Sequence, residues 1–374
     1  MPPVMAVDLG SATISAAAAQ PSTEPDPAVL TVDGQSSYSP ATCVDIEGVP
    51  HPSTWAGEAV DHAPRPDLLL GRPPQIIGEV PLSGATMVGV AIGPALAAAA
   101  DHFGAEPTVL VGVHPHWWPA GKVADYERAL ARLTPHTALI SWPEAIAAQT
   151  VPPSTASHVT VMDFGASTAT ITVISFSRRG VPEVRFTHTD RAGGSRGVDR
   201  LIVADAAVAA GIDLSDQSAT WWEEAAAQAA DARRRECTET SSWPATVDIT
   251  FPAPLGARQV RGPRLRQLTT THMQKVVAGL IGHEEVQAAW SDDRTSTTTQ
   301  PLVEVTGGFG QDASVLSAVK AEAGRADLVP EPASAAAFGA VLAHAPAWVP
   351  ASQKPSRFRF GRSRTAVPSQ RERS

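Results

Sequence analysis

The sequence predicts an α/β protein whose chain is organised as two similar halves. Short runs rich in β-branched residues alternate with longer segments of helical periodicity, which is the pattern of an α/β fold. A strand-and-turn segment at residues 4–13 recurs at residues 159–168. The 374 residues suffice for two domains, and a hydrophobic content of 43% against 18% charged residues can supply a sizeable core. We therefore expect a first half at 1–152, a second half at 153–345 and a tail at 346–374.

The first half opens with an apolar strand from Val4, a small-residue turn and a second alternating segment at 14–19. The predicted elements after it are strands at 29–33 and 41–46, a Pro-rich stretch at 50–81, a helix at 95–103, a strand at 108–113, a helix at 122–133, a strand at 137–142 and a helix at 144–150. Residues 151–158 are rich in Pro, Ser and Thr, which is typical of a joint between two units.

The second half repeats this opening with a strand from Val159 and a partner strand at 170–176. The remaining predicted elements are a strand at 181–189, helices at 197–210 and 221–236, a strand at 245–251, helices at 263–281 and 284–290, a strand at 302–306, and helices at 311–324 and 333–345. We expect each half to contribute a sheet flanked by helices.

Cysteine content and hydropathy limit the compartment and the class of protein. The two cysteines, Cys43 and Cys237, are too few for a disulfide framework or a four-cysteine zinc site. The longest apolar run, at residues 87–100, is interrupted by glycine and proline and is shorter than a transmembrane segment. No basic stretch precedes a hydrophobic stretch at the N-terminus, so we expect no secretory signal and a cytoplasmic location.

Charge is distributed unevenly along the chain. Residues 351–374 carry a net charge of +6, whereas residues 1–350 carry −15. An acidic body argues against a nucleic-acid-binding face. In the basic segment, arginines alternate with Phe358 and Phe360 without helical or strand periodicity. We expect 346–374 to be a disordered tail that contacts an acidic protein partner or an anionic lipid surface, which would place the protein at the membrane periphery.

Both repeated segments end an apolar strand with the pattern D-x-G-x-x-T. Small residues in such a turn let backbone N–H groups approach a phosphate chain and offset its charge. A carboxylate at the strand end can hold the water shell of a magnesium ion. The alternative is a pair of ordinary β-hairpins with small turns. The phosphate hypothesis assigns the magnesium ion to Asp8 and Asp163, and the phosphates to Asp8, Gly10, Ser11, Ala12, Gly165, Ala166, Ser167 and Thr168.

A third glycine-rich turn follows the strand predicted at 302–306. Backbone without side chains can lie flat against a nucleoside. Ala313 breaks the G-x-G-x-x-G pattern of dinucleotide sites, and the chain has no P-loop pattern. The residues of this turn that we expect to contact a nucleoside are Gly307, Gly308, Phe309 and Gln311.

These three elements, in this order, resemble the nucleotide-binding superfamily of actin and the sugar kinases. The closer resemblance is to the ATPase domain of DnaK-type heat-shock chaperones, the heat shock protein 70 family, and it covers most of residues 4–345. It implies an actin-like ATPase fold of two lobes, each of βββαβα architecture, around a cleft that binds ATP or ADP with Mg²⁺. The other segments that carry it are Val109–Trp117, Trp142–Ala148, Gly193–Leu201, Ala229–Glu239, Arg261–Leu268 and Glu331–Ala340.

The resemblance implies a role for each matching residue. The family counterparts of Asp8 and Asp163 hold a hydrated magnesium ion, and the counterpart of Glu144 orders the attacking water. These three residues are therefore the expected catalytic groups. The helix that begins near Ala229 contacts the adenosine in the family. The remaining expected contacts with the nucleotide are Gly193, Gly194, Asp231, Arg234 and Arg235.

Departures from the family pattern lower the expected activity. No lysine precedes Lys122, so the family's phosphate-contacting lysine is replaced at best by Arg72, whose guanidinium fork is not equivalent to an ammonium group. Ala166 and Ser167 replace two glycines of the second phosphate turn, where a Cβ atom makes a positive φ costly and crowds a phosphate. Further replacements are Thr170 for an aspartate, Phe309 for a serine and Gln311 for an arginine.

The sequence thus predicts a divergent DnaK-like ATP-binding protein, a weak and slow ATPase at most, that acts as a nucleotide-dependent switch. About 30 residues follow residue 345, too few for the family's peptide-binding domain, so client holding by that route is not expected. The alternative is a degenerate pseudo-ATPase that serves as scaffold or regulator of a membrane-associated assembly, such as secretion or cell-envelope machinery. A filament-forming actin relative is a third option.

One further pattern points to different chemistry. Gly193–Gly197 matches G-x-S-x-G, the nucleophile elbow of serine hydrolases, with His272, His283 and His344 as candidate partners. Four residues separate it from the preceding strand, however, so the turn is not abrupt. Two other groups are interpreted as structural: the histidines His114 and His116, and the tryptophan pairs Trp117–Trp118 and Trp221–Trp222.

Overall fold

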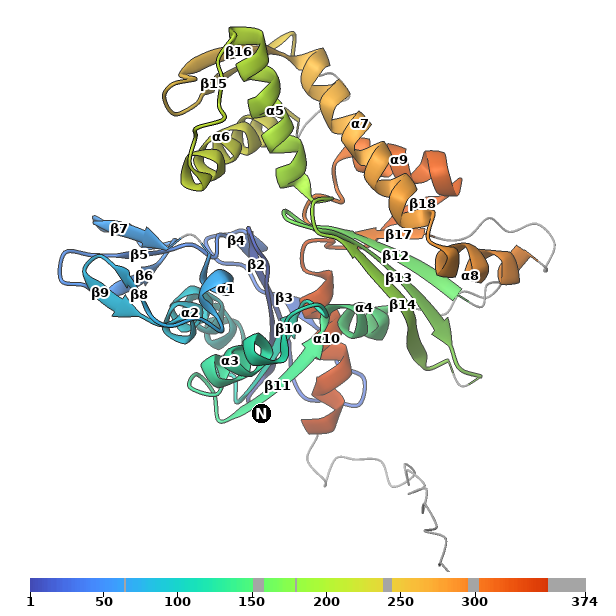
Figure 1. The fold of residues 1–374 in the computed structure, drawn as a ribbon. Coiled ribbons are helices and arrows are strands. Elements are labelled where there is room, and N and C mark those ends of the chain that lie inside the picture. The colour runs from blue at the N-terminus through green and yellow to red at the C-terminus, as the bar shows by residue number, and fades with distance from the viewer. Residues whose placement is uncertain (64, 151–157, 179, 238–243, 295–302, 349–374) are drawn as a thin grey trace, which may run out of the picture.

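The computed structural model describes the chain except for residues 64, 151–157, 179, 238–243, 295–302 and 349–374. The described residues form a mixed α/β structure with ten α-helices and five sheets, of which two are large (Figure 1). The α/β class predicted from the sequence is therefore confirmed. The expected joint at 151–158 and the tail lie largely outside the described residues. At the end of the second half, a short 3₁₀ turn (Ala345–Trp348) continues beyond residue 345.

The first large sheet is built around an antiparallel hairpin at the N-terminus. Its central strand pairs on one side with the antiparallel second strand of the hairpin and on the other with one parallel strand, which in turn pairs with a further parallel strand. The order is β11-β10-β1-β2-β3, and β4 also pairs with β2. The strands are β1 (Val4–Leu9), β2 (Ile14–Ala19), β3 (Ala28–Val29), β4 (Ser37–Tyr38), β10 (Val109–His114) and β11 (His136–Ser141).

The second large sheet has the same strand arrangement. Its order is β18-β17-β12-β13-β14, with β12 antiparallel to β13 and parallel to β17, as β1 is to β2 and β10. The strands are β12 (His158–Phe164), β13 (Ala169–Phe176), β14 (Pro182–Asp190), β17 (Val303–Thr306) and β18 (Ala326–Leu328). The sequence repeat therefore corresponds to equivalent hairpins at the centres of two topologically matching sheets.

Two helices lie between the two large sheets (Figure 1). They are α4 (Trp142–Gln149) and α10 (Ala335–His344). Helix α10 packs against β1, β2 and β10, whereas α4 packs against β14 as well as β11. The two helices approach closely, because a Cβ atom added at Gly339 would lie 1.9 Å from the carbonyl oxygen of Ala145. One apolar core therefore joins residues of both sheets through these helices.

The remaining long helices form two further apolar cores with the sheets. Alternate residues of β1, such as Met5 and Val7, are fully buried against a second core, which explains why that strand is apolar on both faces. These helices are α2 (Gly84–Phe103) and α3 (Ala120–Leu130) with the first sheet, and α7 (Gly262–Ile281), α8 (Glu284–Arg294) and α9 (Ala313–Ala323) with the second. Helices α5 (Ser195–Ala210) and α6 (Ala219–Cys237) pack on each other beyond the end of the second sheet (Figure 1).

Helix α2 is longer than the sequence pattern predicts. It begins at Gly84 rather than residue 95, because the side chain of Ser83 accepts a hydrogen bond from the Thr86 N–H, and it ends where Gly104 is left-handed. By length and composition, α2 alone among the helices of the described residues would suffice to cross a membrane. Its apolar face is instead buried on the first sheet through residues such as Val88 and Ile92.

Several short elements escape the sequence prediction. The Pro-rich stretch forms edge strands and one helical turn, because proline is tolerated at sheet edges and at helix starts. These elements are β6 (Pro50–Pro52), β7 (Asp61–Ala63), α1 (Pro66–Leu69), β8 (Gln75–Ile77) and β9 (Val80–Leu82). Strands β6 and β7 both pair with β5 (Thr42–Val44). In the second half, the predicted strand β15 (Thr246–Thr250) pairs with the unpredicted β16 (Ala257–Arg261).

Candidate functional site

A cavity of about 500 Å³ lies where the turns of the two central hairpins meet. The β1–β2 turn borders it from the first sheet, and the β12–β13 turn and the turn after β17 border it from the second. Most of the site residues predicted from the sequence line it. They are Asp8, Gly10, Ser11, Ala12, Asp163, Gly165, Ala166, Ser167, Thr168, Arg234, Gly307, Gly308, Phe309 and Gln311.

The two hairpin turns are tight. The Gly165 N–H donates to the Thr168 carbonyl oxygen at 2.9 Å, which closes the second turn. In the first turn, a Cβ atom at Gly10 would lie 2.6 Å from the Thr13 carbonyl oxygen, so glycine is required there. Neither Ala166 nor Ser167 has a positive φ, so the backbone strain expected from their Cβ atoms does not arise.

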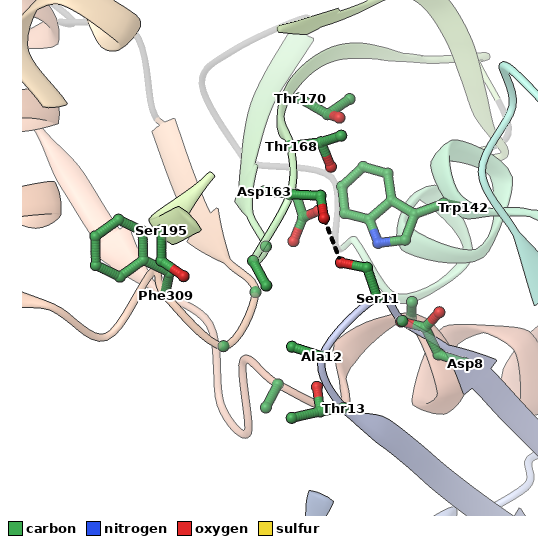
Figure 2. Close-up of a pocket in the computed structure, with 18 of the residues that line it drawn as sticks. Asp8, Ser11, Ala12, Thr13, Trp142, Asp163, Thr168, Thr170, Ser195 and Phe309 are labelled. Carbon is green, nitrogen blue, oxygen red and sulfur yellow. Dashed lines mark hydrogen bonds between the residues drawn. The ribbon is translucent and has the colours of Figure 1, made fainter. Parts of the chain in front are cut away.

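Asp8 and Asp163 lie at the carboxyl-terminal ends of the two central strands and face the same cavity (Figure 2). Burial raises the pKa of Asp8 to about 7; burial and then the charge of Asp8 raise the pKa of Asp163 to about 8. Among the described ion pairs, neither carboxylate has a Lys or Arg partner. Two carboxyl groups without a basic partner at one floor can supply the oxygen ligands that a hydrated magnesium ion requires.

The turn after β17 forms a third wall of the cavity and packs against Asp163 at the cavity floor. Gly307 has a φ of 87°, and a Cβ atom there would lie 2.3 Å from Asp163 Oδ1, so only glycine fits. The Phe309 N–H donates to the Phe164 carbonyl oxygen at 2.9 Å, which ties the turn to β12. The backbone at Gly308 faces open space, since no atom lies within 4 Å of an added Cβ. This turn can therefore approach a flat ligand closely.

A buried arginine supports the Phe309 ring from α6. The Arg233 guanidinium carbon lies 4.7 Å from the ring centroid, and Arg233 Nε donates to Asp199 Oδ1 at 3.0 Å. Arg233 also pairs with Asp312 at 3.5 Å. The sequence reasoning missed Arg233, although α6 carried the signal: it lies on the same helical face as the buried Ala226 and Ala229.

The other residues expected from α6 are placed differently. Arg234 lines the cavity and forms an exposed pair with Asp231, which itself does not line it. The side chain of Arg235 lies outside the described residues.

Gly193 and Gly194 lie behind the second turn rather than at the cavity surface. A Cβ atom at Gly194 would lie 2.5 Å from the Ala166 carbonyl oxygen. At the start of α5, the Ser195 N–H donates to the Gly165 carbonyl oxygen at 3.1 Å, and the Arg196 N–H donates to that of Ala166 at 2.8 Å. The glycine pair thus lets α5 seat against the turn and orient it.

Glu144 does not reach the cavity. Its Oε2 accepts from the Ser141 N–H at 3.1 Å and from the Ser141 hydroxyl at 2.5 Å, which forms a capping box at the start of α4. The residue lines a separate groove with His344. Its neighbour Trp142 lines the cavity instead, with the indole on the side opposite the Phe309 ring (Figure 2).

The first half supplies a cation at a place other than the one expected. Arg65 lines the cavity and donates to both carboxylate oxygens of Asp67, at 3.2 and 3.1 Å. Lys122 lies 3.8 Å from Asp67 and 4.1 Å from the Trp118 ring centroid. Arg72, the cation singled out from the sequence, does not line the cavity.

Tryptophans interpreted as packing residues also border the cavity. Trp117 and Trp118 line it with His116, in the loop that follows the carboxyl-terminal end of β10. This position was a usable signal, because ligands of open α/β sheets bind beyond the carboxyl ends of the strands. The aromatic rings give the cavity apolar walls around a polar floor.

Ser195, the serine of the G-x-S-x-G pattern, is buried and lines the cavity at the first residue of α5. Of the candidate histidines, His272 lies against Gly197. No hydrogen bond between Ser195 and a histidine occurs among the described residues, so the arrangement lacks the nucleophile–base contact of a hydrolase in this part of the chain.

Comparison with known proteins assigns no family to the chain: no protein-family model matches it, and no curated protein matches it.

Proposed function

We propose that the chain is an ATP-binding protein with an actin-like ATPase fold, related to the ATPase domain of DnaK-type chaperones. The observation that carries the proposal is the convergence of three glycine-containing turns on one cavity above two half-buried carboxyl groups. The matching strand orders of the two large sheets support the fold.

In this proposal each wall of the cavity binds a different part of the magnesium–nucleotide complex. The hairpin turns at 10–13 and 165–168 bind the phosphates through backbone N–H groups. Asp8 and Asp163 hold the water shell of a magnesium ion, which supplies positive charge to neutralise the phosphates when bound. Phe309 and Arg234 bind the nucleoside beside the Gly307–Gly308 backbone.

Hydrolysis is expected to be weak. Phosphoryl transfer depends on positioning and electrostatic stabilisation, and Glu144 is engaged in a helix cap outside the cavity. Tight binding without fast chemistry suits a switch, because a ligand that favours one arrangement of the two sheets shifts its population. We therefore propose a nucleotide-dependent switch that is read by a protein partner.

The second candidate is a pseudo-ATPase that works as a scaffold without nucleotide. It is favoured by a specific contact: the Ser167 hydroxyl donates to Ser11 Oγ at 2.8 Å, so the two turns are bonded to each other (Figure 2, dashed line at Ser11). A phosphate bound by both turns has to replace this bond.

Calorimetric titration with ATP and ADP, with and without Mg²⁺, tests the proposal. We expect Mg²⁺-dependent binding that is weakened about tenfold or more in Asp8→Asn and Asp163→Asn, because each variant removes a charged ligand. Asp101→Asn, on the exposed face of α2, is the matched control and should bind as the wild type does. Absence of binding in the wild type would support the scaffold instead.

A further inference from the structure

One arginine, which is not itself among the residues that line the cavity, connects the two hairpin turns. Arg196, in the first turn of α5, donates from one guanidinium nitrogen to Ser167 Oγ at 3.0 Å and from the other to the Ser11 carbonyl oxygen at 3.0 Å. With the Ser167–Ser11 bond, these contacts form a bridge between segments more than 150 residues apart in the chain.

The positive charge in this bridge is poorly compensated. Both acceptors of the guanidinium are neutral, and its nearest described carboxylate, Glu223, is 3.8 Å away and also pairs with Arg200. Burial, and then the charge of Arg65, lower the pKa of Arg196. The side chain is still 25% exposed, so a solute can reach it. A cation held by neutral oxygens gains free energy when an anion replaces them.

We infer that Arg196 is the phosphate-binding cation of this site, which takes a nucleotide phosphate at the junction of the two turns. This inference rests on the proposed function. A phosphate contacted by both turns lies where Ser11 and Ser167 now meet, and the guanidinium fork is already directed at that junction. The bidentate geometry of arginine suits phosphate oxygens. Arg196 thus supplies from the second half a positive charge at the junction of the two turns.

The test compares Arg196→Gln with Arg200→Gln by competition binding. Arg200 is the matched control because it lies one turn along α5 and pairs with the same Glu223, but makes no described contact with either hairpin turn. The probes are Mg-ATP, inorganic tripolyphosphate as the phosphate chain alone, and adenosine as the nucleoside alone. Thermal unfolding of each variant checks that it is folded.

We expect Arg196→Gln to weaken Mg-ATP and tripolyphosphate by about tenfold or more, as for loss of a charge-assisted hydrogen bond, and to leave adenosine unchanged. Arg200→Gln should match the wild type, and Arg196→Lys should recover part of the loss. If wild-type protein binds ATP and Arg196→Gln binds Mg-ATP and tripolyphosphate equally well, the inference is wrong while the proposed function stands. If wild-type protein binds no ATP, the proposed function is wrong and the inference is overturned with it.

Discussion

The two carboxyl groups at the cavity floor make stability depend on pH. In the folded chain the pKa values of Asp8 and Asp163 are about 7 and 8, against an ordinary value of 3.8. A carboxyl with a raised pKa binds its proton more tightly when the chain is folded. Its stabilising contribution is therefore complete below the unfolded pKa and is lost as the pH rises through the folded value. We expect the free energy of unfolding to decrease between about pH 4 and pH 8.

Urea unfolding at about pH 5 and about pH 8 measures this decrease. In Asp8→Asn and Asp163→Asn, one titrating group is removed, so the difference between the two pH values should shrink. Asp101→Asn should keep it. A decrease of the same size in all three variants would show that other groups cause the pH dependence.

The buried arginine under Phe309 gives a second prediction at the residue scale. Asp199 and Arg233 are 1% and 5% exposed, so Arg233→Met leaves the Asp199 carboxylate buried and unpaired. Loss of one partner of a buried ion pair costs about 3–5 kcal/mol of unfolding free energy. Denaturant unfolding of Arg233→Met should show a loss of this order, whereas Arg234→Met, at an exposed pair, should change little. Equal losses of unfolding free energy in the two variants would contradict a stabilising role for the buried ion pair.

At the scale of elements, the crossing of α4 and α10 depends on one glycine. A Cβ atom at Gly339 would lie 1.9 Å from the Ala145 carbonyl oxygen, so Gly339→Ala forces the two helices apart. Such overpacking costs about 1–3 kcal/mol. Gly279→Ala, in the exposed interior of α7 with no atom within 4 Å, should stabilise by about 0.5–1 kcal/mol. The thermal unfolding temperatures of the two variants should shift in opposite directions. A Gly339→Ala protein as stable as the wild type would contradict the close approach of α4 and α10 at Gly339.

The elements that the sequence predicts well are those whose pattern is local. The hairpins at the two central strands have unbroken apolar runs and small turns, and both form as expected. The edge strands of the Pro-rich stretch have no such pattern, because proline interrupts the alternation that defines a strand.

The same contrast separates the predicted from the unpredicted site residues. Turn residues such as Gly10 and Gly307 follow from their own segments. Whether Glu144 or its neighbour Trp142 faces the cavity depends on which side chain caps α4, and this is decided by Ser141. The position of Arg65 beside the two hairpin turns depends on pairing between distant segments, which no local pattern contains.

At the scale of the whole molecule, charge separation predicts an association. Residues 351–374 carry +6 against −15 for the rest of the chain, and each basic residue near an anionic membrane contributes about 1 kcal/mol. Deletion of 351–374 should reduce co-sedimentation with phosphatidylserine vesicles at low salt, and leave thermal unfolding and ATP titration unchanged. Added salt should weaken the wild-type association. Identical sedimentation of both forms would contradict a role for this segment.

The place of α10 has a consequence for biosynthesis. The helix that covers β1, β2 and β10 is the last α-helix of the described residues to be translated, more than 300 residues after β1 and β2 and more than 200 after β10. Until it emerges from the ribosome, the apolar face of the first sheet has no permanent cover, and closing so long a loop is slow. The nascent chain therefore passes through a long interval in which its first half exposes an aggregation-prone apolar surface. Truncated translation products that end before Ala335 should be substrates for quality-control proteases.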